Sequence, residues 1–305
     1  MTISNLPPSP KQYLHVHEQF RYVCELSDAQ RIAFLDEPRW VGYSHAKFVM
    51  DTLVGLMNKP KRPRMPNLLL VGDSNNGKTT IIRRFEKLCG TGYVDEESEA
   101  VRPIVIAESP PGADEKGLYI SILSQFWSPV RANATATVLR HDAINKLRRC
   151  KAKVLIIEEL HSLLIGPAVK QRLLMNAIKM LCNELCIPVV GVGTRDAVRV
   201  LHTDPQHASR FDVISLPKWE LNKDFQTLLA GFESVLPLKR QSGLSNPELA
   251  TALHTICDGN LGDLHRLLVK CTNNAITKGT EQITMDIVQS NQWLKPTKGH
   301  RELGE

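Results

Sequence analysis

A lysine and a threonine that follow a glycine-containing loop are the residues of this sequence best suited to chemistry on a phosphate. The loop follows an apolar run, in the segment Asn67-Leu-Leu-Leu-Val-Gly-Asp-Ser-Asn-Asn-Gly-Lys-Thr-Thr80. Its spacing Gly72-x-x-x-x-Gly77-Lys78-Thr79, with an amphipathic run after it, is the P-loop pattern in its strand–loop–helix setting. A surface turn rich in glycine and asparagine is the alternative, and the flanking patterns disfavour it.

The P-loop pattern predicts a role for each residue in it. Backbone N–H groups of the loop turn inward around phosphate oxygens, and the helix from Lys78 adds the positive end of its dipole. We expect Lys78 to reach the β- and γ-phosphates and Thr79 to bind Mg²⁺, while Thr80 caps the helix or packs. The predicted ATP-binding residues are Gly72, Asp73, Ser74, Asn75, Asn76, Gly77, Lys78, Thr79 and Thr80.

Two adjacent glutamates end a second apolar strand, Lys153-Val-Leu-Ile-Ile-Glu158-Glu159. Adjacent strand residues point to opposite sides, so one carboxylate could face Mg²⁺ through water while the next faces the γ-phosphate. We assign Glu158 to the metal and Glu159 to orienting or deprotonating the attacking water. A strand end that merely becomes polar is the alternative. ATPases of this type usually have Asp at the position of Glu158, so we expect slow hydrolysis.

Five further residues are candidates for the nucleotide site. Thr194 ends another apolar run and could hydrogen-bond the γ-phosphate or the lytic water, and a simple Gly-Thr strand stop is the alternative. Arg210 precedes the last strand and could stabilise transition-state charge at a neighbouring subunit's nucleotide. Arg266 follows a glycine-rich turn on an amphipathic helix, and either arginine could instead serve surface solubility. Trp40 and Tyr43 could stack on an adenine ring or pack the N-terminal segment onto the core.

The elements that must position these residues alternate between apolar runs and segments of helical periodicity. Near-continuous apolar strands separated by helices indicate an α/β fold, with a parallel sheet covered on both faces. Ligands of such sheets bind at the carboxyl ends of the strands. Strands are expected near 68–72, 103–107, 153–158, 187–193 and 212–216, and helices near 78–89, 115–127, 137–150, 168–186 and 195–202.

The strand pattern ends at Pro217, and the rest of the chain has helical patterning. Helices are expected near 222–236, 246–257, 261–277 and 283–293, the second with Ser245 as N-cap because Pro247 suits the first helical position. The predicted domains are an N-terminal leader with helices (1–66), an α/β core (67–217), a small helical lid domain (218–294) and a flexible tail (295–305).

The composition and the lengths of the apolar runs indicate a globular protein without membrane-spanning segments. The chain has 305 residues, 42% of them hydrophobic, which favours about two domains. No apolar run is long enough to span a bilayer, and the start lacks a basic segment followed by an apolar core, so cytoplasmic residence is expected. Seven cysteines fit buried thiols better than disulfides, and we expect Cys182 and Cys186 to pack in the core rather than bind metal. The net charge of +6 permits an anionic partner without requiring one.

The order of the motifs resembles that of the AAA+ ATPases: a P-loop, an acidic strand end, a strand ending in threonine, Ser209-Arg210-Phe211 and a helical lid with Arg266. Over about residues 35 to 290 the chain is similar to the TniB/TnsC family, in the segments Arg39–Tyr43, Leu69–Thr79, Ile157-Glu-Glu-Leu-His161 and Gly191-Val-Gly-Thr194. The resemblance implies an ATP-dependent regulator that assembles on double-stranded DNA as a hexameric ring or helical filament. Such a regulator links a target-selection protein to a DDE-type transposase and disassembles on hydrolysis.

The resemblance places the DNA side of the assembly around Glu108–Lys116 and the neighbouring helices. The candidates by charge are Lys116, Arg131, Lys146, Arg148 and Arg149, and the basic run Lys59–Arg64 is either a solvated linker or a further contact. A solvated basic face is the alternative for each candidate. Two other functions stay open: an ATPase of the replication-loader type, and a nucleotide-gated scaffold that barely hydrolyses ATP.

Overall fold

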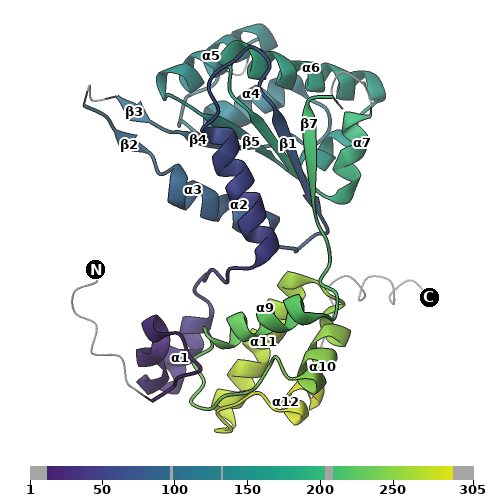
Figure 1. The fold of residues 1–305 in the computed structure, drawn as a ribbon. Helices are drawn as coiled ribbons and strands as arrows, with labels where there is room; N and C mark the ends of the chain where they lie inside the picture. The colour runs from purple at the N-terminus through teal and green to yellow at the C-terminus, as the bar shows by residue number, and fades with distance from the viewer. Residues whose placement is uncertain (1–11, 97–98, 132, 203–208, 291–305) are drawn as a thin grey trace. The chain divides into compact units, whose positions relative to one another are not determined.

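The computed structural model describes residues 12–96, 99–131, 133–202 and 209–290, and the chain forms two compact units (Figure 1). An α/β unit comprises Ser44–Pro217, and a helical unit joins Met1–Tyr43 to Lys218–Glu305. The N-terminal segment thus differs from the leader predicted over 1–66: its described residues up to Tyr43 pack with the helical unit, whereas α2 (Ser44–Met57) belongs to the α/β unit. The predicted tail, 295–305, lies outside the described residues.

The α/β unit is built on a parallel sheet with the strand order β4-β5-β6-β1-β7. Its strands are β1 (Asn67–Gly72), β4 (Ile104–Glu108), β5 (Val154–Glu158), β6 (Val189–Gly193) and β7 (Phe211–Leu216). The registers Glu108↔Glu158 and Val71↔Gly193 align the carboxyl ends of four strands at one edge. A short antiparallel pair, β2 (Tyr93–Val94) and β3 (Ala100–Val101), was not predicted, because two residues per strand are too few to give a periodic signal.

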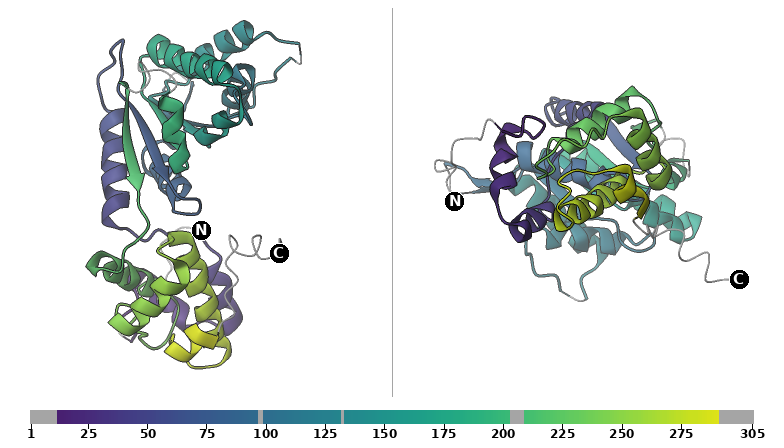
Figure 2. Two further views of the ribbon diagram at one scale, coloured as in Figure 1. Left: turned by 90° about the vertical axis from the view of Figure 1, so that its right-hand side faces the viewer. Right: turned by 90° about the horizontal axis from the view of Figure 1, so that it is seen from below.

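Helices cover both faces of the sheet. Along β1 all six residues are buried, and Leu69 and Val71 belong to the core formed with α4, α5 and α6, whereas Leu68 and Leu70 face the other side. The left view of Figure 2 shows α2 on one side of the strands and the teal helices on the other. The helices and turns of this unit after α2 are α3 (Lys78–Cys89), α4 (Glu115–Ser124), α5 (Ala136–Arg149), η3 (Leu160–Ile165), α6 (Ala168–Leu185), η4 (Arg195–Ala197) and α7 (Val198–Leu201).

The helical unit contains η2 (Glu18–Glu25), α1 (Asp28–Leu35), α9 (Lys223–Glu233), α10 (Pro247–Cys257), α11 (Leu261–Thr277) and α12 (Met285–Ser290). A buried ion pair joins its two chain segments: Arg31 on α1 is fully buried and binds Glu281 and the carbonyl oxygen of Pro237 (2.7 Å). The Glu233 carboxylate accepts backbone N–H groups of Ser242 (2.6 Å) and the two residues after it. These contacts explain why residues 12–43 fold with this unit.

Predicted and observed boundaries differ at several helix ends. The helices expected to reach 127 and 236 end at Ser124 and Glu233, and 291–293 lie outside the described residues. Pro247 takes the first helical position of α10 as predicted, but the N-cap is Asn246 rather than Ser245, because the residue directly before that position adopts the extended cap conformation.

Cys182 is fully buried, as packing in the core requires, and Cys186 is half-buried at the end of α6. The thiol of Cys182 lies 3.4 Å from Oδ1 of Asn67, so it contacts the base of the sheet. Within the described ranges, no helix is both long and apolar enough to cross a bilayer.

Candidate functional site

A cavity of about 250 Å³ lies where β1, β5 and β6 end. Three segments far apart in the sequence supply its lining: the P-loop with the start of α3, the residues after β5, and the residue after β6. The lining residues are Ser74, Asn75, Asn76, Gly77, Lys78, Thr79, Thr80, Glu159, His161 and Thr194. They meet because a parallel sheet gathers the carboxyl ends of its strands at one edge.

The P-loop backbone turns at two residues with positive φ, Asn75 (60°) and Gly77 (83°). Glycine enters this region without steric cost, and asparagine tolerates it better than most residues. α3 begins directly after Gly77, which has no side chain to cap the first N–H groups of the helix. An anion in the cavity can therefore take the place of a cap.

The ammonium group of Lys78 is held inside the loop. Its Nζ donates to the carbonyl oxygens of Gly72 (2.9 Å) and Asp73 (2.7 Å), and only 9% of the residue is exposed. Burial lowers the pKa of Lys78, and the negative charges of Glu159 and Asp73 act in the opposite direction. Because an ammonium has three N–H donors, the two carbonyls use two of them, and phosphate is the acceptor expected for the third.

Two side-chain contacts brace the loop against neighbouring strands. The Asp73 carboxylate pairs with the Arg195 guanidinium, with Nε 2.8 Å from Oδ1, which ties the loop to the end of β6. Asn76 is buried and donates through Nδ2 to the carbonyl oxygens of Leu216 (3.1 Å) and Pro217 (3.0 Å). The loop is therefore fixed to the strands on both sides of β1.

Glu159 lines the cavity, but it is not part of a strand. β5 ends at Glu158, and Glu159 has φ 56° and ψ 34°, in the left-handed region, before η3 begins. The expectation that both glutamates continue the strand is therefore wrong. A turn at Glu159, rather than strand alternation, separates the two carboxylates and directs Glu159 toward the P-loop cavity.

Glu158 lies beside the cavity rather than in its lining. Its Oε2 pairs with the Arg83 guanidinium on α3 at 3.4 Å, and its Oε1 is buried with no hydrogen-bond partner among the described residues. A buried carboxylate oxygen of this kind fits a water molecule bound to Mg²⁺, and the exposed hydroxyl of Thr79 adds an oxygen of the type that Mg²⁺ prefers. The residues present thus fit the metal, with Glu158 acting through water.

His161 was given no separate role in the sequence analysis, yet it joins two of the predicted residues. Its Nδ1 lies 3.4 Å from the backbone nitrogen of Thr194, and its Nε2 lies 3.3 Å from Oε2 of Glu159. In the sequence, this histidine stands two residues after Glu159, at the end of one of the segments that carry the family resemblance. That signal gains meaning once η3 is known to turn the ring toward β6.

Arg210 is not brought to this cavity. It precedes β7, whose Phe211 pairs with Asn67 at the start of β1, whereas the P-loop follows the end of β1. The strand of six residues places Arg210 about 20 Å from its own P-loop at about 3.3 Å per residue. Its guanidinium instead donates to Oδ1 of Asn183 at 2.9 Å.

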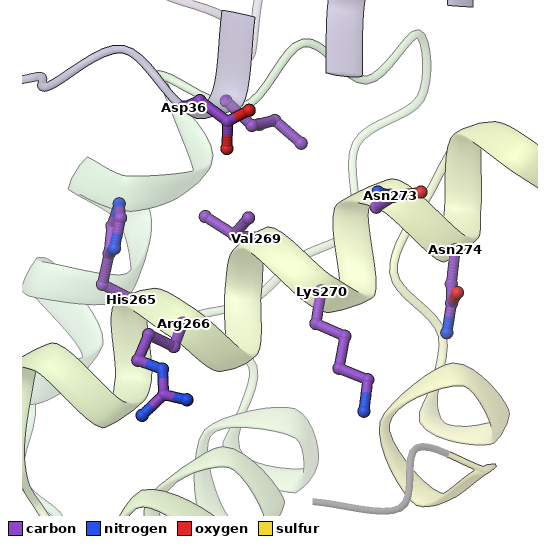
Figure 3. Close-up of a pocket in the computed structure, with 8 residues that line it drawn as sticks. Asp36, His265, Arg266, Val269, Lys270, Asn273 and Asn274 are labelled. Carbon is purple, nitrogen blue, oxygen red and sulfur yellow. The ribbon is translucent and has the colours of Figure 1, made fainter. Parts of the chain in front are cut away.

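Arg266, Trp40 and Tyr43 lie in the helical unit. Arg266 lines a second cavity of about 680 Å³ with Leu35, Asp36, His265, Val269, Lys270, Asn273 and Asn274. Figure 3 shows Arg266 and Lys270 along one helix, α11, and Asp36 on a separate segment. Tyr43 packs edge-to-face on Trp219, with ring centroids 5.2 Å apart, and burial raises its pKa to about 12. Within the helical unit, the structure thus gives Tyr43 a packing contact, and Trp40 is half-buried.

The predicted DNA contacts do not form one group. Lys116 lies in the first turn of α4, next to the end of β4, and Arg131 is exposed in the segment between α4 and α5. Lys146, Arg148 and Arg149 lie in the last turn of α5, which leads into the opposite, amino-terminal edge of the sheet. The structure therefore distributes these cations over two edges.

Comparisons with known proteins agree with this architecture. No curated protein matches the sequence. Among solved structures, Cdc6p from Pyrobaculum aerophilum is similar with a TM-score of 0.59 at 16% identity, covering 85% of this chain and 68% of that one. The Aeropyrum pernix ORC1 protein in complex with DNA is similar with a TM-score of 0.55 at 15% identity, covering 85% of this chain and 68% of that one. Drosophila ORC bound to DNA is similar with a TM-score of 0.56 at 14% identity, covering 98% of this chain and 74% of that one.

At these identities the likeness establishes the fold, and it confirms the predicted AAA+ P-loop architecture with a helical C-terminal region. The family described as bacterial TniB protein matches residues 31–221. That range includes the P-loop, both glutamates after β5 and Thr194, and it is more than half of the chain. This chain therefore belongs to the bacterial TniB family.

Proposed function

We propose that this protein is an ATP-dependent DNA-binding ATPase that assembles on double-stranded target DNA and recruits and activates a transposase. ATP hydrolysis then drives disassembly. The observation that carries the proposal is the cavity in which Lys78, Thr79, Glu159 and Thr194 meet, on a chain of the TniB family. These residue types are those that phosphoryl transfer to water requires.

Several residues in and beside the cavity have a task in the proposed hydrolysis. The loop N–H groups and Lys78 bind the β- and γ-phosphates. Thr79, and Glu158 through water, would hold Mg²⁺, which would neutralise charge on the phosphates. Glu159 orients the attacking water and accepts its proton, and Thr194 hydrogen-bonds the γ-phosphate or that water.

Arg210 acts on the nucleotide of a neighbouring subunit in this proposal. Its distance from its own P-loop, about six strand residues, supports action between subunits and argues against action within one. A homo-oligomer, either a ring or a filament, follows from this requirement. Arg266 is proposed to bind nucleotide from the helical lid.

Double-stranded DNA is the proposed support of the assembly. The α/β unit carries 24 lysines and arginines against 17 aspartates and glutamates, which favours a polyanionic partner. Two of the structurally similar proteins were solved with DNA, and we extend that property to this chain as part of the proposal. The TniB family supports a DDE-type transposase and a target-selection protein as partners.

Capture of the transposase encoded in the same element tests the proposal. The protein is bound to immobilised DNA with a non-hydrolysable ATP analogue, with ADP or without nucleotide. The amount of transposase that the DNA retains is measured in each state. We expect retention only with the analogue. Equal retention in all three states would leave the protein a passive tether and defeat the proposal.

A nucleotide-gated scaffold with very slow hydrolysis is the second candidate, and Glu158 favours it. The pairing of this carboxylate with Arg83 holds it beside the cavity, and its extra methylene displaces it relative to aspartate. Steady-state turnover with and without DNA separates the two candidates, because the scaffold would hydrolyse ATP very slowly in both conditions. A replication-type loader has only the likeness to Cdc6 and ORC proteins in its favour, which concerns the fold.

A further inference from the structure

A chain of contacts crosses the cavity from Thr194 to Glu159 through the ring of His161. We propose that His161 is a positioning residue that holds the Glu159 carboxylate toward the attacking water and links it to the end of β6. The inference rests on the proposed ATPase function and assigns a task to a residue outside the P-loop and the glutamate pair.

The hydrogen bond at Nδ1 decides which tautomer the neutral ring adopts. The backbone N–H of Thr194 donates to Nδ1 at 3.4 Å, so Nδ1 carries a lone pair and the ring proton is on Nε2. Nε2 lies 3.3 Å from Oε2 of Glu159 and therefore donates to the carboxylate. The imidazole thus accepts from Thr194, the residue after β6, and donates to Glu159, the residue after β5.

The backbone leaves room for this ring. A Cβ atom added at Gly193 would lie 3.2 Å from the backbone nitrogen of His161 and 3.5 Å from its Nδ1. It would also lie 2.8 Å from Cβ of Ala197, so the glycine at the end of β6 keeps His161 and η4 close to the strand. The imidazole is therefore packed into a defined place, with 30% of its side chain exposed.

Glu159 needs such a partner because, among the described residues, its carboxylate has no hydrogen bond or ion pair other than the contact with His161. Its side chain is 49% exposed, and its backbone is in a left-handed turn rather than in a strand. A glutamate in this setting has several rotamers, and a displacement of about 1 Å in a reacting group can lower a rate about 100-fold. By donating from a packed ring, His161 selects the rotamer that faces the cavity.

The link also joins two residues with different tasks. The position of Thr194 at the end of β6 is transmitted through one imidazole to Glu159 at the end of β5. If the γ-phosphate hydrogen-bonds Thr194, the same contact positions the residue that activates water. Loss of the ring would therefore affect turnover and leave nucleotide binding intact.

Steady-state ATPase assays of His161 variants in the full-length protein with DNA test this inference. We expect His161→Ala to lower kcat roughly 10- to 100-fold, with KM and ATP affinity changed less than twofold. His161→Gln, whose amide nitrogen can occupy the place of Nε2, should regain part of the rate, and His161→Asn, which reaches only the place of Nδ1, should not. Ser162→Ala, at the next residue of η3, is the control for local disruption and should retain wild-type kcat.

A double-mutant cycle with Glu159→Gln separates positioning from general disruption. If His161 acts through Glu159, adding His161→Ala to Glu159→Gln lowers kcat no further. Additive losses, or a His161→Ala protein with wild-type kcat, would overturn the inference while the proposed function stands. No ATP turnover by the wild-type protein with DNA and transposase would instead count against the proposed function itself.

Discussion

Two buried charged residues of the helical unit, Arg31 and Glu233, are more completely paired than Lys78 and Glu158 of the α/β unit. In the helical unit, Arg31 binds Glu281, Asp28 and the Pro237 carbonyl, and Glu233 accepts three backbone N–H groups, so these charges are satisfied within the unit. In the α/β unit, Lys78 uses two donors on carbonyls and Glu158 has a buried oxygen with no described partner. Saturated buried charges fix a fold, whereas incompletely paired ones at a sheet edge are typical of a ligand site.

The units also differ in net charge. The α/β unit has 24 basic and 17 acidic residues, and the helical unit has 14 basic and 15 acidic residues. The excess positive charge of the chain therefore lies entirely in the unit that holds the P-loop. We expect the binding of nucleotide and DNA to depend on the α/β unit. We expect the stability of the helical unit to depend on the buried contacts of Arg31 and Glu233.

The largest effect should follow from Glu159→Gln. The amide keeps the shape of the side chain but cannot accept a proton, so turnover should fall by about 10²- to 10⁴-fold while ATP binding persists. Turnover and nucleotide titration measure the two quantities, and assemblies on DNA should live longer. Glu158→Gln is the comparison, and a larger loss from it would reverse the roles of the two carboxylates.

The second effect concerns the buried ion pair between Arg31 and Glu281 in the helical unit. Arg31→Met leaves Glu281 without its partner and should lower the free energy of unfolding of this unit by roughly 3 to 5 kcal/mol. Chemical denaturation followed by a probe of the helical unit measures it. Arg240→Met, at an exposed arginine, should change stability little, and an equal loss in both variants would show that the ion pair is not decisive.

The same pair predicts a pH dependence. Burial acts to raise the pKa of Glu281, but the hydrogen bond and charge of Arg31 outweigh it and hold the pKa below its ordinary value. A depressed folded-state pKa contributes stability above the unfolded value of about 4.3, and this contribution is lost as the pH falls through the folded-state pKa. Denaturation midpoints between pH 6 and pH 3 should therefore fall less steeply in Arg31→Met than in the wild type.

Lys78→Ala should weaken ATP binding by roughly 10- to 100-fold, because it removes a charged donor worth about 1.5 to 3 kcal/mol while the loop amides remain. Nucleotide titration measures the affinity. Unfolding of the helical unit should be unchanged, which is the contrast with Arg31→Met. Unaltered ATP affinity would remove the P-loop from the proposed function.

The smallest effect tests helix capping in the helical unit. Asn260 accepts N–H groups of Gly262 and Asp263 at the start of α11, so Asn260→Ala should cost about 1 kcal/mol of stability. Asn246, the N-cap of α10, makes no such side-chain bond, and Asn246→Ala should cost less. Equal losses at the two caps would mean that backbone conformation, rather than the hydrogen bond, sets the effect.

The sequence predicts the sheet and P-loop well because both depend on local signals. Apolar runs mark strands buried on both faces, and the glycine spacing with Lys78 identifies a phosphate loop. The pairing of Arg31 with Glu281, 250 positions apart, has no local signature, so the docking of the N-terminal segment onto the helical unit was missed. The turn at Glu159 was missed for a related reason: a left-handed glutamate is disfavoured locally and depends on its surroundings.

Asn76 connects the P-loop to the end of the α/β unit. Its amide holds the last two carbonyls of the α/β unit, those of Leu216 and Pro217, just before the chain passes into the helical unit. A nucleotide that shifts the loop must either carry the end of β7 with it or break two hydrogen bonds. Together with the pairing of Gly72 with Leu216, this amide makes the last residues of the α/β unit direct neighbours of the loop that we propose binds phosphate.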